Sequence, residues 1–172
     1  MSEFIPVLTK EEIEAQVSHI AQRISTDYKD RELILIGILK GAFIFLSDLI
    51  RQLSIPVKVD FMSVSSYGGS TSSSGRIKLT KDVDIEIKNK DILIVEDIVD
   101  TGLTLSYLVD YLKSSGAASV RICTLIDKRE RRETDVTADY ACHTVEKGFL
   151  VGYGLDYAEF YRNLPEVYHL KL

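Results

Sequence analysis

The sequence predicts a single α/β domain whose core is a mostly parallel β-sheet flanked by helices. Short, uninterrupted apolar runs recur along the chain, and such runs are typical of strands that are buried on both faces. Segments with apolar residues at helical spacing follow two of these runs, at 33–39 and 92–95. The 172 residues are enough for one sizeable core. Ligands of a parallel sheet bind at the carboxyl ends of its strands, so we look there for the site.

The composition limits the classes of function. Hydrophobic residues make up 45% and charged residues 27%, as is typical of a soluble globular protein. The net charge of −5 argues against a protein whose main task is binding nucleic acid. Two cysteines without metal-ligand spacing fit a reducing compartment, and we see neither a signal peptide nor an apolar run long enough for a bilayer. We therefore expect a cytoplasmic protein.

The first helix is predicted over residues 10–25, where the apolar residues fall on one face. Thr9 is a suitable N-cap for this helix, and Glu12 lies three positions further on, as in a capping box. The first buried strand begins at Leu33 and continues through Ile38 and Leu39.

A turn with a cation and a glycine follows this strand, at Lys40 and Gly41, before a second helix over 43–53. The ammonium of Lys40 could contact an anion, and Gly41 allows a close approach of the backbone. Taken alone this pattern is weak, because a lysine at a helix start is usually solvated.

A serine- and glycine-rich segment, 65–75, follows the strand that begins at Val57. Its flanks, 61–64 and 77–87, are interpreted as strands of a long hairpin. A disordered linker is the alternative. Because a linker would interrupt a single domain, and long loops inside compact domains are usually lids, we favour a lid.

The central stretch, 91–104, is the most informative. A buried strand over Ile92–Val95 stops at two carboxylates, and a small polar turn then leads into a helix that runs toward Gly116. The free amides at a helix start favour an anion, typically a phosphate. Helix capping alone would explain one of the turn's hydrophilic residues, Asp100, Thr101 and Thr104, but not the crowding of all of them beside Glu96 and Asp97.

The last buried strand, Val120–Ile126, ends at a run of charged residues. We interpret Arg129 and Arg131 as a solvated cluster, whereas Lys128 stands at the carboxyl end of the strand, on the same sheet edge as the other loops. Segment 147–157 mixes aromatic, small and acidic residues without helical period and is interpreted as a strand with loops.

Residues 91–104 resemble the phosphoribosyl-pyrophosphate-binding motif of the type I phosphoribosyltransferases, in which a hydrophobic run leads into Glu-Asp, two apolar residues and Asp-Thr-Gly-x-Thr. Segments 65–68 and 147–157 resemble the catalytic loop and the purine-specificity segment of the bacterial-type hypoxanthine-guanine phosphoribosyltransferases. The resemblance extends from the first strand to Asn163. It implies a core over about 30–135, a small hood from the N-terminal segment and about 136–172, and a flexible hairpin lid.

The resemblance also implies roles for individual residues, with Asp100 as the proton acceptor and a cis peptide at Leu39–Lys40. The phosphoribosyl group and its 5-phosphate are implied to contact Glu96, Asp97, Ile98, Val99, Asp100, Thr101, Gly102, Leu103 and Thr104. Pyrophosphate is implied to contact Leu39, Lys40, Gly41 and Arg162, with Ser66 and Tyr67 in the lid. The purine is implied to contact Lys128, Phe149, Leu150 and Asp156. Magnesium is implied to lie near Glu96, Asp97 and Asp156. Arg132 is a candidate for structural or pyrophosphate-side contacts.

The activity implied by the resemblance is purine salvage. Such an enzyme transfers the 5-phosphoribosyl group from phosphoribosyl pyrophosphate to N9 of hypoxanthine or guanine, giving IMP or GMP and pyrophosphate, with Mg²⁺ and as a homodimer or homotetramer. The alternatives are a nucleotide-sensing regulator with the same fold, or a transferase for xanthine or another base. The negative net charge and the intact acidic pair argue against the regulator, and Lys128 with Phe149–Tyr157 argues against orotate or adenine.

Overall fold

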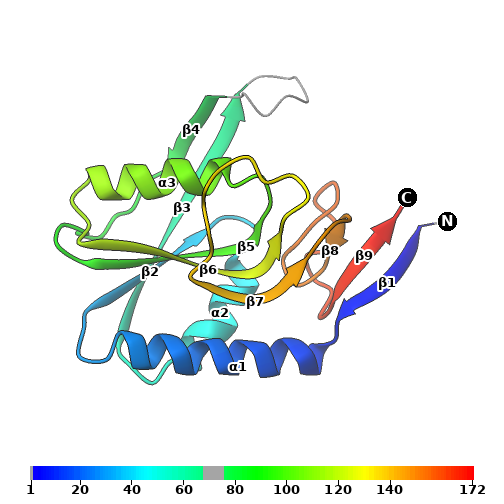
Figure 1. The fold of residues 1–172 in the computed structure, drawn as a ribbon, viewed down its shortest axis with the longest axis horizontal. Coiled ribbons are helices and arrows are strands. Elements are labelled where there is room, and N and C mark those ends of the chain that lie inside the picture. Colours follow the sequence, from blue (N-terminus) through cyan, green and yellow to red (C-terminus); the bar gives the residue numbers. More distant parts are fainter. Residues whose placement is uncertain (1, 68–75) are drawn as a thin grey trace.

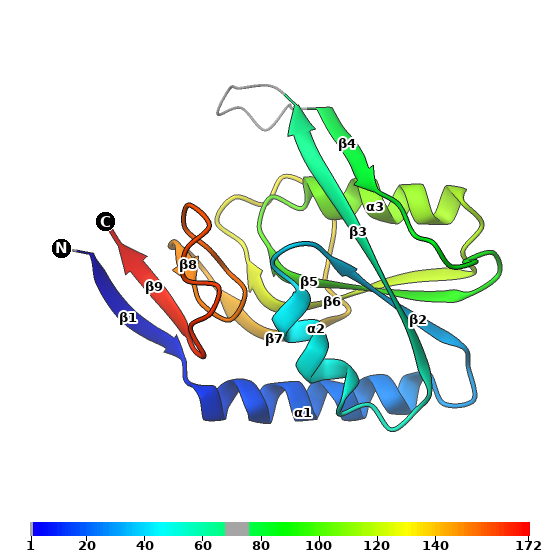
Figure 2. The same ribbon diagram turned by 180° about the vertical axis from the view of Figure 1, so that it is seen from behind.

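A computed structural model describes residues 2–67 and 76–172. These residues form two β-sheets and three helices (Figures 1 and 2). The larger sheet has the order β4-β3-β2-β5-β6-β7 and is parallel except for β4, which pairs antiparallel with β3. The predicted α/β fold with a mostly parallel sheet is therefore confirmed. In chain order the elements are β1 (Glu3–Leu8), α1 (Lys10–Asp27), β2 (Leu33–Ile38), α2 (Phe43–Ile50), β3 (Val57–Tyr67), β4 (Arg76–Lys81), β5 (Asp91–Val99), α3 (Leu103–Ser114), β6 (Ser119–Lys128), β7 (Tyr140–Val145), β8 (Leu150–Val151) and β9 (Val167–Lys171).

The sheet is buried on both faces, as its apolar strands require. In β2, Leu33 and Leu35 join the apolar cluster under α1 and α2, while Ile34 and Ile36 join the cluster under α3. The alternation follows from the two-residue period of a strand. Figure 1 shows α3 on one side of the sheet and α1 with α2 on the other. Because β2 and β5 are parallel neighbours, the strand ends that precede α2 and α3 lie at one edge of the sheet, where a site can form.

Helix α1 begins with the predicted capping box. The Thr9 hydroxyl accepts a hydrogen bond from the backbone N–H of Glu12 (3.1 Å), and the Glu12 carboxylate accepts one from the N–H of Thr9 (2.8 Å). The helix runs to Asp27, two residues beyond the predicted end, and α2 ends at Ile50, before the predicted Leu53.

Two strand boundaries differ from the prediction because hydrogen bonding overrides the apolar pattern. Strand β5 does not stop at Val95 but continues to Val99, since its pairing with β6 extends through Glu96–Thr124 and Val99–Asp127. Strand β4 ends at Lys81 instead of Ile87. Beyond it, the Asp60 carboxylate accepts hydrogen bonds from two backbone N–H groups, of Asp84 and Ile85, which replaces a strand partner.

The segment predicted to form the hood, from about residue 136 onward, contributes strands to both sheets. Strand β7 pairs in parallel with β6 and belongs to the large sheet. The smaller sheet, with the order β1-β9-β8, combines the first strand with residues 150–171. Helix α1 packs against β7 and α2 and is part of the core as well. In residues 2–67 and 76–172, no helix combines the length and apolar character needed to cross a membrane.

Candidate active site

The turn between β5 and α3 lines a cavity of about 210 Å³ bounded by residues 96–102, 104 and 105. Gly102 precedes the helix with a left-handed backbone (φ 84°), a conformation that glycine adopts without steric cost. The Thr101 hydroxyl accepts a hydrogen bond from the N–H of Leu103 (3.3 Å). The first turn of α3 therefore borders a cavity large enough for a phosphate group, as the anion prediction requires.

The acidic pair, Glu96 and Asp97, lies beside this cavity in a nearly buried position. Burial, followed by the neighbouring charge of Asp97, raises the pKa of Glu96 well above its usual range. Burial also raises the pKa of Asp97, although the charge of Arg162 opposes this shift. Two crowded carboxylates supply hard oxygen donors for a divalent cation.

Replacing Glu96 with glutamine is expected to stabilise the unliganded protein. The raised pKa means that the folded state holds the Glu96 proton more tightly than the unfolded chain, so ionisation of Glu96 destabilises the fold as the pH rises above the unfolded-state value. Urea unfolding at neutral pH should show a gain of about 0.5–2 kcal/mol, which shrinks as the pH is lowered. The exposed Glu14 of α1 provides the control substitution, Glu14→Gln; a gain that is equal in both variants, or independent of pH, would contradict the argument.

The turn after β2 contacts the acidic pair directly. The Leu39–Lys40 peptide is cis, as predicted. A side chain at Gly41 would overlap the Asp97 carboxylate, and a side chain at Gly154 would overlap the carbonyl oxygen of Gly41. The turn is therefore held between the Asp97 side chain and the segment after β8, and glycine is required at both contacts.

Lys40 and Arg162, the two cations predicted to contact pyrophosphate, lie on opposite sides of one carboxylate. The Nζ atom of Lys40 is 2.8 Å from Glu159 Oε2, and Nη2 of Arg162 is 3.2 Å from Glu159 Oε1. Arg162 also donates to the Gly154 carbonyl (2.7 Å) and lies 3.3 Å from the carboxylate of Asp156. No sequence pattern indicates a role for Glu159.

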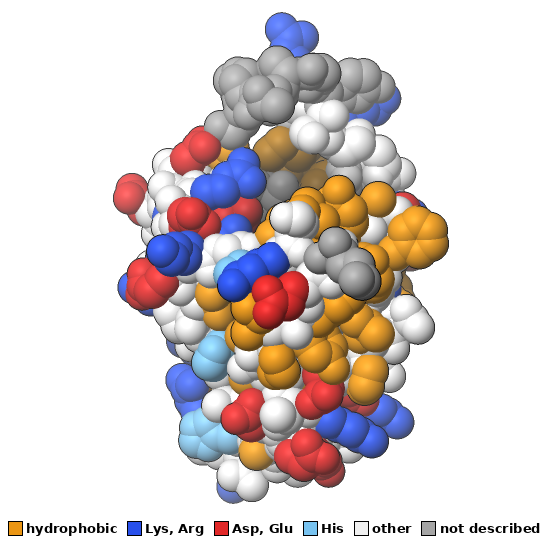
Figure 3. All heavy atoms as spheres, turned by 90° about the vertical axis from the view of Figure 1, so that its right-hand side faces the viewer, with side chains coloured by type: hydrophobic (Ala, Val, Ile, Leu, Met, Phe, Trp, Pro, Cys, Tyr) orange, Lys and Arg blue, Asp and Glu red, His pale blue; other side chains and the backbone are white. Residues whose placement is uncertain are grey.

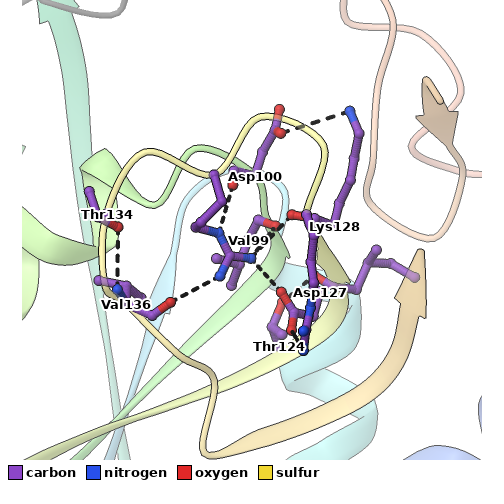
Figure 4. Close-up of polar contacts among 10 residues, drawn as sticks. Val99, Asp100, Thr124, Asp127, Lys128, Thr134 and Val136 are labelled. Atoms are coloured by element: carbon purple, nitrogen blue, oxygen red, sulfur yellow. Dashed lines mark hydrogen bonds and ion pairs between the residues drawn. The ribbon is translucent and has the colours of Figure 1, made fainter. Parts of the chain in front are cut away.

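Lys128 and Asp100 meet at the other end of the site (Figure 4). Nζ of Lys128 lies 3.8 Å from Oδ1 of Asp100 and 3.8 Å from Oε2 of Glu130, and the lysine is buried. Among the residues that the structure describes, Oδ1 of Asp100 has no hydrogen-bond partner. Arg131, interpreted from the sequence as solvated, is exposed as expected, and it lies 3.6 Å from Asp100 Oδ2 because the turn after β6 bends back toward the β5 loop. Arg129 is exposed as expected and pairs with Asp127 (3.2 Å).

Phe149 is 45% exposed and so is not a core residue. Its ring meets that of Tyr157 edge to face, with centroids 5.6 Å apart. The N–H of the preceding Gly148 donates to Glu130 (3.2 Å), which ties this segment to the turn that carries Lys128. Leu150, the next residue, is buried in β8. An exposed aromatic face on a segment tied to the turn of a buried lysine is suited to a planar, polar ligand.

Arg132 joins the phosphate turn to the end of β6. Its guanidinium donates to the carbonyls of Asp100 (3.0 Å), Lys128 (3.1 Å) and Val136 (2.9 Å), and it pairs with the buried carboxylate of Asp127. Figure 4 shows Asp100, Lys128 and Asp127 gathered in this network. Two roles were considered for Arg132, structural contacts and pyrophosphate-side contacts. These contacts support the structural role.

The predicted lid falls partly outside the described residues. Ser66 is exposed near the end of β3, Tyr67 is the last residue of that strand, and residues 68–75 are outside the described part of the chain.

Comparison with known proteins agrees with this geometry. A family model described as a phosphoribosyl transferase domain matches residues 7–158. The hypoxanthine-guanine phosphoribosyltransferase of Bacillus subtilis (strain 168) is 47% identical over 96% of this chain and 92% of its own, and that of Streptococcus mutans serotype c is 48% identical over 95% and 91%. The crystal structure of a hypoxanthine phosphoribosyltransferase from Staphylococcus aureus superposes with a TM-score of 0.93 at 43% identity, covering 96% of this chain and 90% of that one. With the matched domain, these relatives and the site described above, the chain belongs to the phosphoribosyltransferase family.

Proposed function

We propose that this protein is a purine salvage transferase that moves the 5-phosphoribosyl group from phosphoribosyl pyrophosphate to N9 of hypoxanthine or guanine. The observation that carries the proposal is the ion pair of Lys128 with Asp100, which lines the cavity, together with the exposed Phe149 face on the segment that Gly148 ties to the Lys128 turn. A 6-oxopurine offers an exocyclic oxygen for the lysine, a ring nitrogen for the carboxylate and a planar face for the aromatic ring. The products are IMP or GMP and pyrophosphate.

Each part of phosphoribosyl pyrophosphate has a proposed place. The 5-phosphate occupies the cavity and accepts hydrogen bonds from the amides and hydroxyls of residues 100–104. Glu96 and Asp97 accept hydrogen bonds from the ribose hydroxyls. Lys40, the adjoining backbone of Leu39 and Gly41, and Arg162 hold the pyrophosphate, and Ser66 with Tyr67 belongs to a lid over it.

The proposed reaction is displacement of pyrophosphate from C1 of the ribose. Purine N9 forms the new bond while the bond to the pyrophosphate oxygen breaks, through a transition state with oxocarbenium character. The carboxylate of Asp100 accepts the proton that leaves the purine at N7, and Lys128 donates a hydrogen bond to O6. Lys40 and Arg162 stabilise the charge that grows on the leaving group. Leu150 contacts the base through its backbone.

The residues present fit Mg²⁺ together with substrate. Glu96 and Asp97 are crowded carboxylates whose pKa values are raised, and Asp156 lies on the adjoining loop near Arg162. No group of three or more such ligands gathers within the described residues, which agrees with an ion that shares its coordination with phosphates and waters. When bound, the ion supplies charge neutralisation for pyrophosphate.

The nucleotide-sensing regulator and the xanthine transferase are the alternatives to this activity. The relatives reported above carry the names of hypoxanthine and hypoxanthine-guanine enzymes, and nothing in them supports either alternative. The net charge of −5 also disfavours a nucleic-acid-binding regulator.

A spectrophotometric assay with phosphoribosyl pyrophosphate, Mg²⁺ and one purine at a time tests the proposal. We expect turnover of hypoxanthine, guanine or both, and a loss of turnover when Mg²⁺ is chelated. Turnover of adenine or orotate alone, or of no base, would remove the proposal. A strong preference for xanthine would replace it with the alternative transferase.

We also propose that the protein is a cytoplasmic homodimer or homotetramer. Figure 3 shows hydrophobic side chains gathered on one face. The described residues also include the exposed Phe4 and Phe160, which pack around Tyr161 with ring centroids 5.2 and 6.4 Å away. Exposed aromatic groups of this kind favour contact with another chain. Light scattering coupled to size-exclusion chromatography measures the mass directly, and a monomer of 19.4 kDa would contradict the proposal.

A further inference from the structure

A single carboxylate, that of Glu159, forms ion pairs with both of the cations proposed to bind pyrophosphate. One oxygen of Glu159 lies 2.8 Å from Lys40 Nζ, and the other lies 3.2 Å from Arg162 Nη2. A bound anion would use the same two groups in the same bridging manner. The protein's own side chain therefore takes the place expected for the leaving group.

The backbone that presents Glu159 is strained. Ala158, Glu159 and Tyr161 all have left-handed backbones, with φ values of 51°, 70° and 78°, although none is glycine. Such conformations cost on the order of 1–3 kcal/mol each and persist where the surrounding structure enforces them, often at functional sites. The turn is closed by a β-bridge between Tyr157 and Phe160 and by a hydrogen bond from the Glu159 N–H to Asp156 (2.8 Å). The fold thus fixes the Glu159 backbone over the cations.

The charges favour an ionised Glu159. The hydrogen bond from Lys40, followed by the charge of Lys40, lowers the pKa of the Glu159 carboxyl below its usual value. Pyrophosphate and Glu159 are therefore anions that require the same two cations, and they cannot hold both cations at once.

We propose that Glu159 is a positioning residue that competes with pyrophosphate for Lys40 and Arg162. It keeps the two cations in place when the site is empty, and it returns to them as pyrophosphate leaves, which weakens product binding and favours release. The inference rests on the proposed pyrophosphate role of Lys40 and Arg162. Because both members of the Lys40–Glu159 pair are more than 60% exposed, the effect should be modest.

Replacing Glu159 with glutamine tests this competition. Glutamine keeps the size of the side chain and one acceptor oxygen, but it lacks the negative charge and the second acceptor. Titration calorimetry with magnesium pyrophosphate should show about two- to fivefold tighter binding to Glu159→Gln than to the unsubstituted protein, in line with the strength of exposed ion pairs. The inhibition constant of pyrophosphate as a product should fall by the same factor, while the KM for hypoxanthine stays unchanged.

Glu3→Gln is the matched control. Glu3 of β1 is similarly exposed and lies 3.9 Å from Lys171, so this variant has the same change in net charge without a contact to Lys40. Its affinity for pyrophosphate should equal that of the unsubstituted protein. An affinity of Glu159→Gln that is unchanged, lower, or raised only as much as in Glu3→Gln would overturn the inference.

Lys40→Ala separates this failure from failure of the proposed function. If Lys40→Ala weakens pyrophosphate binding while Glu159→Gln leaves it unchanged, Lys40 binds the leaving group and only the competition is wrong. If Lys40→Ala binds pyrophosphate as well as the unsubstituted protein does, the proposed role of Lys40 is wrong, and the inference that depends on it is wrong too.

Discussion

Replacing Asp100 with asparagine is expected to lower kcat by about 10²–10⁴-fold, the usual contribution of general-base catalysis. The asparagine side chain has nearly the same shape and still accepts a hydrogen bond, but it cannot take up the purine proton at neutral pH. Lys128, 3.8 Å from one carboxylate oxygen, and Arg131, 3.6 Å from the other, keep the carboxylate at the base end of the site. Steady-state rates with hypoxanthine and saturating phosphoribosyl pyrophosphate measure the loss.

The binding of IMP separates a chemical role of Asp100 from a structural one. The backbone of the phosphate turn is held by Arg132, which donates to the Asp100 carbonyl and not to its side chain, so the affinity for IMP should change little. Asp110, exposed on α3, provides the control variant Asp110→Asn, which should keep full turnover. Unchanged turnover in Asp100→Asn would remove Asp100 from the role of proton acceptor.

The phosphate turn could be predicted from sequence because its signals are local. An apolar run, two carboxylates and a polar turn before a helical pattern lie within 91–104, and the structure has a cavity there bordered by the start of α3. The capping box at Thr9 was predictable for the same reason. In each case the interacting groups are a few residues apart in the chain, so no knowledge of the tertiary fold is needed.

Contacts between distant segments could not be predicted in this way. The pairing of Glu159 with Lys40 joins residues 119 positions apart, and an isolated Glu in a loop has no pattern that indicates its partner. The ion pair of Arg131 with Asp100 has no sequence signal either, because only the path of the turn after β6 brings the two residues together. The place of β7 in the large sheet could not be predicted because its pairing with β6 depends on the arrangement of the whole sheet.

Replacing Lys128 with alanine is expected to raise the KM for hypoxanthine by about 5- to 150-fold while the affinity for phosphoribosyl pyrophosphate changes little. The lysine is buried, so its loss would leave the purine O6 without a partner in a desolvated position, at a cost of about 1–3 kcal/mol. The cavity and cations proposed for phosphoribosyl pyrophosphate lie around residues 96–105, Lys40 and Arg162, so this change leaves them intact. Initial-rate kinetics with each substrate varied in turn give the two values.

The comparison of the KM values for the two substrates is the decisive measurement, because a damaged fold would change both KM values. Lys29→Ala, at an exposed position, is the control for the loss of a positive charge and should leave both KM values unchanged. Lys128 also lies 3.8 Å from Asp100, so its removal leaves that carboxylate with Arg131 as its remaining ion-pair partner among the described residues, and kcat is expected to fall less than in Asp100→Asn. An equal loss of affinity for both substrates in Lys128→Ala would show that the lysine supports the whole site, and the assignment of Lys128 to the purine would then be wrong.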